Sequence, residues 1–199
     1  PFSNHAAILE EIRDCVAGKI VVDAVVPLVP PKVSLVQLPA QGSAAQIAQA
    51  RLGDGVRVVS AFHHVGAAKL RAGGAVDCDV LVFGNDREAR DAVIALADAI
   101  GTRGIDGGPI ANSVAAEALT SVLIGVNRRY KVDGAGIRIT GITGATSRAY
   151  RRNAPGSSRR KRAIRTSTAR ITSGIPTQLR LGSLRVKPSY DRLQNFQRD

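Results

Sequence analysis

Histidines are the side chains of this sequence best able to take part in chemistry near neutral pH, and there are three of them: His5, His63 and His64. From the residues alone, His63 is best explained as a strand-end histidine that the backbone satisfies. We expect His64 to point to the opposite side, because successive strand residues alternate faces. His5 is expected to have a structural role in the first turn of a helix.

Common catalytic and phosphate-binding motifs are missing from the sequence. It contains no G-x-G-x-x-G, no P-loop, no nucleophile elbow and no H-E-x-x-H metal motif. Turn or cap roles without chemistry are expected for Gly73-Gly74, Gly84-Asn85-Asp86, Gly107-Gly108 and Asn112. The residues therefore predict no metal site and no stand-alone dinucleotide site.

Helical and strand periodicities alternate along residues 1–142, which predicts an α/β fold with βαβ units and a largely parallel sheet. Helices are expected over 4–17 with Ser3 or Asn4 as the N-cap, 43–52, 87–100 with Asn85 or Asp86 as the N-cap, and 113–131 after Asn112. Strands are expected over 19–26, 56–62, 79–83 and 103–106. The first strand is nearly all apolar, so we expect it to be covered on both faces.

The expected helix over 113–131 is apolar around most of its circumference until its basic end. Such a helix is usually buried, either in a core or against a second subunit. The sequence therefore predicts a homodimer formed through residues 112–131. Arg128, Arg129 and Lys131 lie at the C-terminus of this helix, where the helix dipole stabilises cations.

Charge divides the chain into two unlike segments. Residues 1–142 hold 14 basic and 14 acidic side chains, whereas residues 143–199 hold 14 basic and 2 acidic ones, so the net charge of +12 lies entirely in the second segment. That segment has no sustained periodicity and is rich in Ser, Thr and Gly, which predicts a disordered basic tail. Nucleic-acid binding is expected only through this tail.

Several features bear on the cellular compartment. Cys15 and Cys78 show no CxxC or histidine spacing, which favours reduced thiols, and no secretory signal or stretch of about 20 uninterrupted apolar residues is present. We therefore expect a cytoplasmic protein that does not span a membrane. Because the sequence begins at Pro1 and contains no Met, we also expect its N-terminus to be processed or cut off.

A series of segments in this order resembles the NADPH-dependent reductases of the 8-hydroxy-5-deazaflavin coenzyme F420. They cover nearly all of residues 1–142, and each is weak alone. The segments are PFSNH before a helix, KIVVDAVVPLVP, GSAAQIAQARL, VVSAFHHVGAAKL, DVLVFGNDREARDAV, GGPIANSVAAEALTSVLIGVNRRYK and AGIRITGI.

The resemblance implies that residues 1–142 form the C-terminal portion of a Rossmann-like, doubly wound, mostly parallel sheet. In that family the glycine fingerprint and the 2′-phosphate contacts precede such segments. The resemblance therefore implies that roughly the first third of a normal domain lies upstream of Pro1 and is missing here. It stops at Ile142, so residues 143–199 are expected to be an acquired extension.

The resemblance also implies which residues bind the two coenzymes, NADP(H) and F420. Phe2 would lie beside the nicotinamide, and Pro27, Leu28 and Val29 would lie at a strand end where a cleft opens. His63, Val65 and Ala67 would line the deazaflavin ring, with His63 hydrogen-bonded to the ring oxygens, and Ile137 and Arg138 would close over the pocket. Gly66 stands where some relatives carry Pro.

Hydride transfer between two such coenzymes needs few polar catalysts, because both are hydride carriers themselves. The expected work of the protein is to hold them face to face and to exclude water, and no catalytic residue is assigned. Two alternatives stay open. One is a non-catalytic domain fragment with a nucleic-acid-binding tail, and the other is a reductase whose acceptor is an imine or a ferric chelate.

Overall fold

The structure is a computed structural model and describes residues 1–73 and 76–142. The predicted disordered tail, residues 143–199, lies outside the described residues, as does Gly74 of the predicted Gly73-Gly74 turn. The helices are α1 Phe2–Ile12, α2 Ala44–Leu52, α3 Ala67–Ala72, α4 Arg87–Ala99 and α5 Ser113–Tyr130, with short 3-10 turns over Arg13–Cys15 and Ile110–Asn112. The strands are β1 Ile20–Asp23, β2 Arg57–Ser60, β3 Asp79–Gly84 and β4 Arg103–Gly108.

The four strands form one sheet in the order β1-β2-β3-β4. β1 and β2 are parallel, and so are β3 and β4. β2 and β3 are antiparallel and pair only through Val59 with Gly84 and Ser60 with Phe83. The prediction of a mostly parallel α/β sheet is confirmed, and the antiparallel pairing at its centre is an addition to it.

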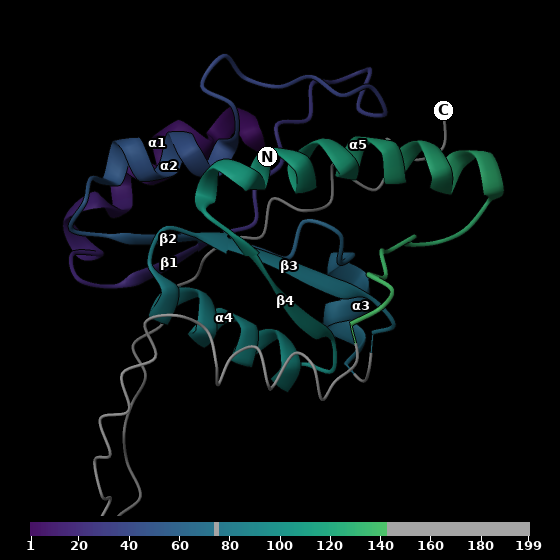
Figure 1. Cartoon of the computed structure of the whole chain (residues 1–199). Helices are drawn as coiled ribbons and strands as arrows, with labels where there is room; N and C mark the ends of the chain where they lie inside the picture. The colour runs from purple at the N-terminus through teal and green to yellow at the C-terminus, as the bar shows by residue number, and fades with distance from the viewer. Residues whose placement is uncertain (74–75, 143–199) are drawn as a thin grey trace, which may run out of the picture. The chain divides into compact units, whose positions relative to one another are not determined.

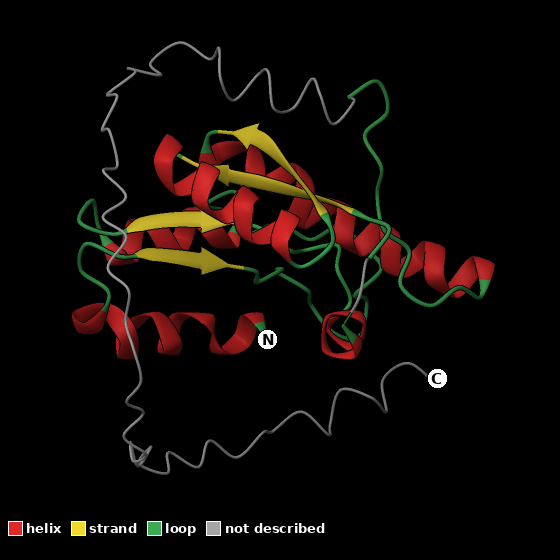
Figure 2. Ribbon diagram, turned by 90° about the horizontal axis from the view of Figure 1, so that it is seen from below, coloured by secondary structure: helices red, strands yellow, loops and turns green. Residues whose placement is uncertain are grey.

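Helices cover both faces of this sheet (Figure 1). On one face α1, α2 and α5 lie together, and Leu9, Ala48 and Val58 belong to the core between that layer and the strands. On the other face α4 packs against β2 and β3 through Val93 and Ile94. Figure 2 shows the strands between these helical layers from a second direction. This arrangement is the doubly wound one that the resemblance implies.

Helix caps explain where α2 and α4 begin. The Ser43 hydroxyl accepts a hydrogen bond from the backbone N–H of Gln46, and the Asp86 carboxylate accepts one from Ala89. Each bond satisfies a donor that the first helical turn leaves unpaired. The predicted cap at Asp86 is confirmed. The predicted cap at Ser3 or Asn4 is wrong, since α1 begins at Phe2 and has no side-chain cap.

Other boundaries differ from the prediction for physical reasons. The expected strand 19–26 ends at Asp23, because the carboxylate of Asp23 accepts a hydrogen bond from Val25 and turns the chain. β1 is also the outermost strand of the sheet, and Val22 is 38% exposed, so the expectation of two covered faces is wrong. The helix expected over 4–17 ends at Ile12, and α3 was not expected.

α5 is long and apolar enough, together with the turn before it, to span a membrane by length and composition, and only 28% of that stretch is buried. Helices in the cores of non-membrane proteins pass the same test. One carboxylate, that of Glu117, is buried in this helix and binds the backbone of α2. This bond fixes α5 against the layer that covers the sheet.

Candidate functional site

The carboxyl ends of β1 and β2 bring the predicted site segments together. Asp23 and Ser60 are the last residues of these two strands, and they are neighbours in the parallel register. Both side chains are buried. The segments that follow them, 24–43 and 61–66, contain most of the residues that the resemblance assigns to coenzyme binding. A cleft at the carboxyl ends of parallel strands is the usual ligand site of such sheets.

His5 and Asp23 form a buried pair at this point. Nε2 of His5 lies 2.8 Å from Oδ2 of Asp23, and Oδ1 of Asp23 accepts a hydrogen bond from Val25. The ring of Phe2 lies 6.0 Å from that of His5, centroid to centroid. The predicted nicotinamide-side residue, Phe2, is therefore connected through His5 to the end of β1. The role of His5 as a structural residue is consistent with this contact.

The ring of His63 is hydrogen-bonded to the last residue of β2, Ser60. Nε2 of His63 lies 2.9 Å from Oγ of Ser60, and the Thr120 hydroxyl donates to the His63 carbonyl oxygen at 3.4 Å. The pKa of His63 is lowered to about 4 by burial and, to a smaller extent, by the charge of His64, and Asp23 partly offsets both effects. His63 is therefore a neutral imidazole near neutral pH, which can hydrogen-bond a ligand but brings no positive charge to it.

His64 binds the opposite layer. Nε2 of His64 donates to the backbone carbonyl of Ala116 in α5 at 2.8 Å, and burial lowers the pKa of His64. The prediction that the two histidines point apart used strand alternation, but β2 ends at Ser60 and Phe62 adopts a left-handed φ of 66°. The turn at Phe62, rather than strand alternation, gives the two histidines different partners.

Glu117 is a residue that the sequence analysis did not select. Its side chain is 1% exposed, and its two oxygens accept hydrogen bonds from the backbone N–H groups of Ala44 (2.7 Å) and Ala45 (3.2 Å) at the start of α2. The pKa of Glu117 is raised to about 7, because the effect of burial outweighs the opposite effect of these two hydrogen bonds. A single acid in an otherwise apolar helix is the sequence signal that could have found it.

We call His5, Asp23, Ser60, His63, His64 and Glu117 the histidine cluster. Its members lie within electrostatic reach of one another: Asp23 affects the pKa values of both His63 and Glu117, and His5 affects that of Glu117. The rings of His63 and His64 lie 6.1 Å apart. The cluster can hold or exchange protons and can hydrogen-bond a polar ring. Within the described residues no group of three or more His, Cys, Asp or Glu side chains could hold a metal ion.

The predicted apolar residues of the site differ in exposure. Pro27 is buried, Leu28 is half-buried and Val29 is 44% exposed. Val65 packs against the core of β2, β3 and α4, whereas Ala67 is exposed at the start of α3. Leu28 and Val65 are therefore the two residues of this set that are only partly covered by protein.

Ile137 and Arg138 lie beside the amino end of β3, and no hydrogen bond or ion pair joins them to the other predicted site residues within residues 1–73 and 76–142. The backbone N–H of Asp79 donates to the carbonyl of Ile137 at 2.8 Å, and the N–H of Ile139 donates to the carboxylate of Asp79 at 2.6 Å. Arg103 makes two hydrogen bonds with that carboxylate, at 2.6 and 2.7 Å. The side chain of Arg138, in contrast, is exposed and pairs with Asp77.

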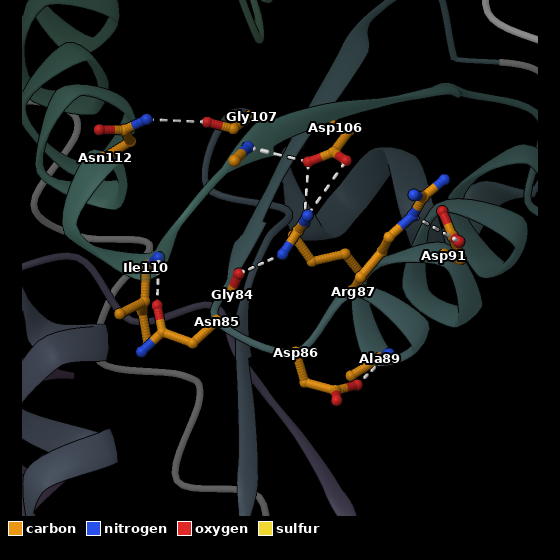
Figure 3. A network of polar contacts seen from close by, with 12 residues as sticks. Gly84, Asn85, Asp86, Arg87, Ala89, Asp91, Asp106, Gly107, Ile110 and Asn112 are labelled. Atoms are coloured by element: carbon orange, nitrogen blue, oxygen red, sulfur yellow. Dashed lines mark hydrogen bonds and ion pairs between the residues drawn. The ribbon is translucent and has the colours of Figure 1, made fainter. Parts of the chain in front are cut away.

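A second group of polar residues connects the ends of β3 and β4 (Figure 3). Arg90 binds the carboxylate of Asp106 through Nε at 2.8 Å and the carbonyl of Gly84 through Nη1 at 2.6 Å. Asn85 accepts from the N–H of Ile110. We call these five residues the Arg90–Asp106 network. Asn85 lies between β3 and α4 and Asp86 caps α4, as expected, whereas Gly84, which was expected in a turn, is the last residue of β3.

One apolar cavity, of about 610 Å³, lies between α3 and α4. It is lined by Phe62, Leu70, Gly73, Val76, Leu96, Ala99, Ile100 and Gly101. None of the residues predicted to bind coenzyme lines it. Phe62, which contributes to its wall, is adjacent in sequence to His63.

The chain is similar in sequence to curated proteins that share one name. The chain is 42% identical over 147 residues to the F420-dependent NADP reductase of Methanocaldococcus jannaschii, and 38% identical over 149 residues to that of Methanothermobacter marburgensis. Each alignment covers 71% of this chain and 66% of the relative. No family model matches the chain.

A solved structure shares the fold. It comes from Arthrobacter sp. FB24 and is provisionally assigned as an F420-dependent NADP reductase. Its TM-score with this chain is 0.58 at 28% sequence identity, and the match covers 69% of this chain and 64% of the other. The chain thus spans about two thirds of the length of the proteins it matches.

Proposed function

The chain is homologous to the F420-dependent NADP reductases, and from this premise we propose that the protein is an oxidoreductase that transfers a hydride between NADP(H) and coenzyme F420. The observation that carries the proposal is the 42% identity over 147 residues to a reductase of that name. The arrangement of the site supports it, since segments around Phe2, Pro27 and His63 meet at the carboxyl ends of β1 and β2.

The residues at this point suit the ring of a deazaflavin. Leu28 and Val65 are only partly covered by protein and can contact an apolar ring face. His63 is neutral near neutral pH, because its pKa is lowered to about 4 by burial. It can therefore hydrogen-bond a ring oxygen without adding a charge that would favour one redox state of the ring strongly.

When bound, the two coenzymes supply the hydride chemistry themselves. The protein holds the two rings and excludes water from them. Phe2 and His5 orient one wall of the site through the bond from His5 to Asp23. His63 and Val65 form the other wall, which α5 holds in place through His64 and Thr120.

Titration of the purified chain with coenzyme F420, followed by deazaflavin fluorescence, tests this proposal. We expect saturable binding, and His63→Ala should weaken it by about five- to a hundredfold, as expected for loss of a hydrogen bond to a partly charged ring. Ala67→Leu should also weaken it, by filling space that the ring needs. NADPH should bind weakly, because the sequence contains no glycine fingerprint.

The F420 and NADPH titrations test different parts of the proposal. No saturable binding of F420 would contradict the proposal. Tight binding of NADPH would contradict the expectation that its main binding segment is missing. Ala92→Gln, at an exposed position of α4 outside the apolar cavity, is the matched control and should leave both titrations unchanged.

A homodimer is the second part of the proposal. α5 buries mainly small or polar residues, namely Ser113, Ala116, Glu117 and Ser121, while Val122 is 48% exposed. The loop before α2 adds Leu35, at 57% exposed, and Ser34 of that loop lies beside Gly125 of α5. An apolar surface shared by two elements in this way is typical of an interface.

Sedimentation equilibrium tests the dimer. The chain should sediment as twice its mass of 20.9 kDa, and Val122→Glu should shift it toward the monomer. Ala95→Glu, at an exposed position of α4 on the opposite helical layer, is the control and should leave the mass unchanged. A monomeric wild-type chain at micromolar concentration would exclude this part of the proposal.

A further inference from the structure

Ser60 is the last residue of β2 and makes one hydrogen bond through its side chain, to the ring of His63. Its side chain is fully buried, and among the described residues its hydroxyl hydrogen-bonds only Nε2 of His63, at 2.9 Å. A serine hydroxyl can donate or accept, and a neutral imidazole nitrogen can do either according to its tautomer. The direction of this one bond therefore fixes which nitrogen of His63 carries the proton.

Hydrogen-bond satisfaction decides the direction. If His63 donated through Nε2, the buried Ser60 proton would have no acceptor among residues 1–73 and 76–142, and a buried unpaired donor is destabilising. If Ser60 donates, its proton and the Nε2 lone pair are both satisfied. The second arrangement is therefore favoured, and it requires the proton of the neutral ring to be on Nδ1.

Nδ1 is then the free end of the imidazole. No hydrogen bond to Nδ1 occurs within the described part of the chain, where every buried side-chain nitrogen and oxygen has a partner. His63 keeps 9% of its surface exposed. Nδ1 is thus not a buried atom without a partner but keeps some accessible surface.

Polar groups of the neighbouring elements do not compete with Ser60 for the ring of His63, because each is bonded elsewhere. Asp23 of β1 is bonded to His5 and does not contact the ring of His63. Thr120 of α5 binds the backbone of His63, not its ring. His64 must donate through its own Nε2, because its partner, the carbonyl of Ala116, can only accept. The two adjacent histidines are therefore expected to carry opposite tautomers.

We propose that Ser60 is a positioning residue: its hydroxyl donates to Nε2 of His63, which holds the neutral ring as the Nδ1–H tautomer and presents that N–H as a donor to an oxygen of the bound coenzyme ring. The tautomer follows from the geometry of Ser60 and His63 alone. The coenzyme as the acceptor rests on the proposed function.

Long-range ¹H–¹⁵N correlation spectra of the labelled chain at pH 7.5 read both tautomers without any ligand. We expect the proton of His63 on Nδ1 and that of His64 on Nε2. In Ser60→Ala, His63 should shift toward the Nε2–H tautomer that free imidazole side chains prefer, while His64 stays unchanged. Ser113→Ala removes another fully buried hydroxyl, which binds Ser43 instead, and should change neither.

A proton on Nε2 of His63 in the wild-type chain would overturn the proposal, and this result needs no variant to fold. A Ser60→Ala spectrum with an unchanged His63 tautomer would overturn it as well. In the F420 titration, Ser60→Ala should weaken binding by about five- to tenfold, and Ser60→Thr, which keeps a hydroxyl, should restore most of it. Should F420 fail to bind the wild-type chain, the proposed function falls while the tautomer result still decides the role of Ser60.

Discussion

The two polar groups of this domain satisfy their buried atoms in different ways. The Arg90–Asp106 network pairs a full positive charge with a full negative one and uses a further donor of Arg90 on the backbone carbonyl of Gly84. The histidine cluster contains two histidines with lowered pKa values, His63 and His64, and a carboxyl group with a raised pKa, that of Glu117. The first arrangement is closed and leaves nothing for a ligand. The second keeps ring nitrogens and protons whose state a ligand can change.

Glu117→Ala should have the largest effect on stability. It leaves the N–H groups of Ala44 and Ala45 without their acceptors and creates a cavity between α5 and α2, so we expect a loss of about 4 kcal/mol in the free energy of unfolding. Urea denaturation measures this. Glu117→Gln keeps one acceptor and should cost about 1 kcal/mol. A loss below 1 kcal/mol for the alanine variant would show that these two hydrogen bonds do not stabilise the packing of α5 against α2.

The second-largest effect should be in the pH dependence of the unfolding free energy, which should distinguish the histidine cluster from the Arg90–Asp106 network. The folded-state pKa of His63 is lowered from 6.5 to about 4, so its neutral form contributes stability above pH 6.5 that is lost as the pH falls toward 4. The loss attributable to His63 is about 3 kcal/mol. The unfolding free energy of the wild type should fall more steeply over this range than that of His63→Gln. Equal slopes would mean that the burial of His63 has no electrostatic cost.

Arg90→Met should have the smallest effect of the three. The pair with Asp106 is largely buried, at 13% and 16% exposed, and its removal leaves the carboxylate with only the N–H of Gly108, so we expect a loss of about 2 kcal/mol. F420 affinity and the acid profile should stay as in the wild type. If Arg90→Met weakened F420 binding, the two polar groups would be coupled and the contrast between them would be wrong.

The elements that were predicted best have strong local signals. α4 has a clear amphipathic pattern and a capping aspartate, and both its start and its cap at Asp86 were predicted. α3 was missed because AAKLRA, only six residues long, has no side-chain cap and no clear period. β1 was predicted too long, because the turn at Asp23 depends on a side-chain bond that the sequence pattern does not show.

The site was only partly predictable for a similar reason. His63 and the loops around it were selected through the family resemblance, and the structure brings those segments together. Asp23, Ser60 and Glu117 were not selected, because their roles depend on partners that only the fold places beside them. Glu117 binds the backbone N–H of Ala44, 73 residues earlier in the chain, and no sequence periodicity relates positions so far apart.

That separation also makes two amide protons informative about folding. The N–H groups of Ala44 and Ala45 belong to a helix start, where amides normally exchange quickly with solvent. Here they are covered by a carboxylate that arrives only when α5 docks, more than 70 residues later in the chain. Their hydrogen exchange therefore reports the opening of α5 from the sheet layer, and the protection of these two amides gives the local free energy of that opening.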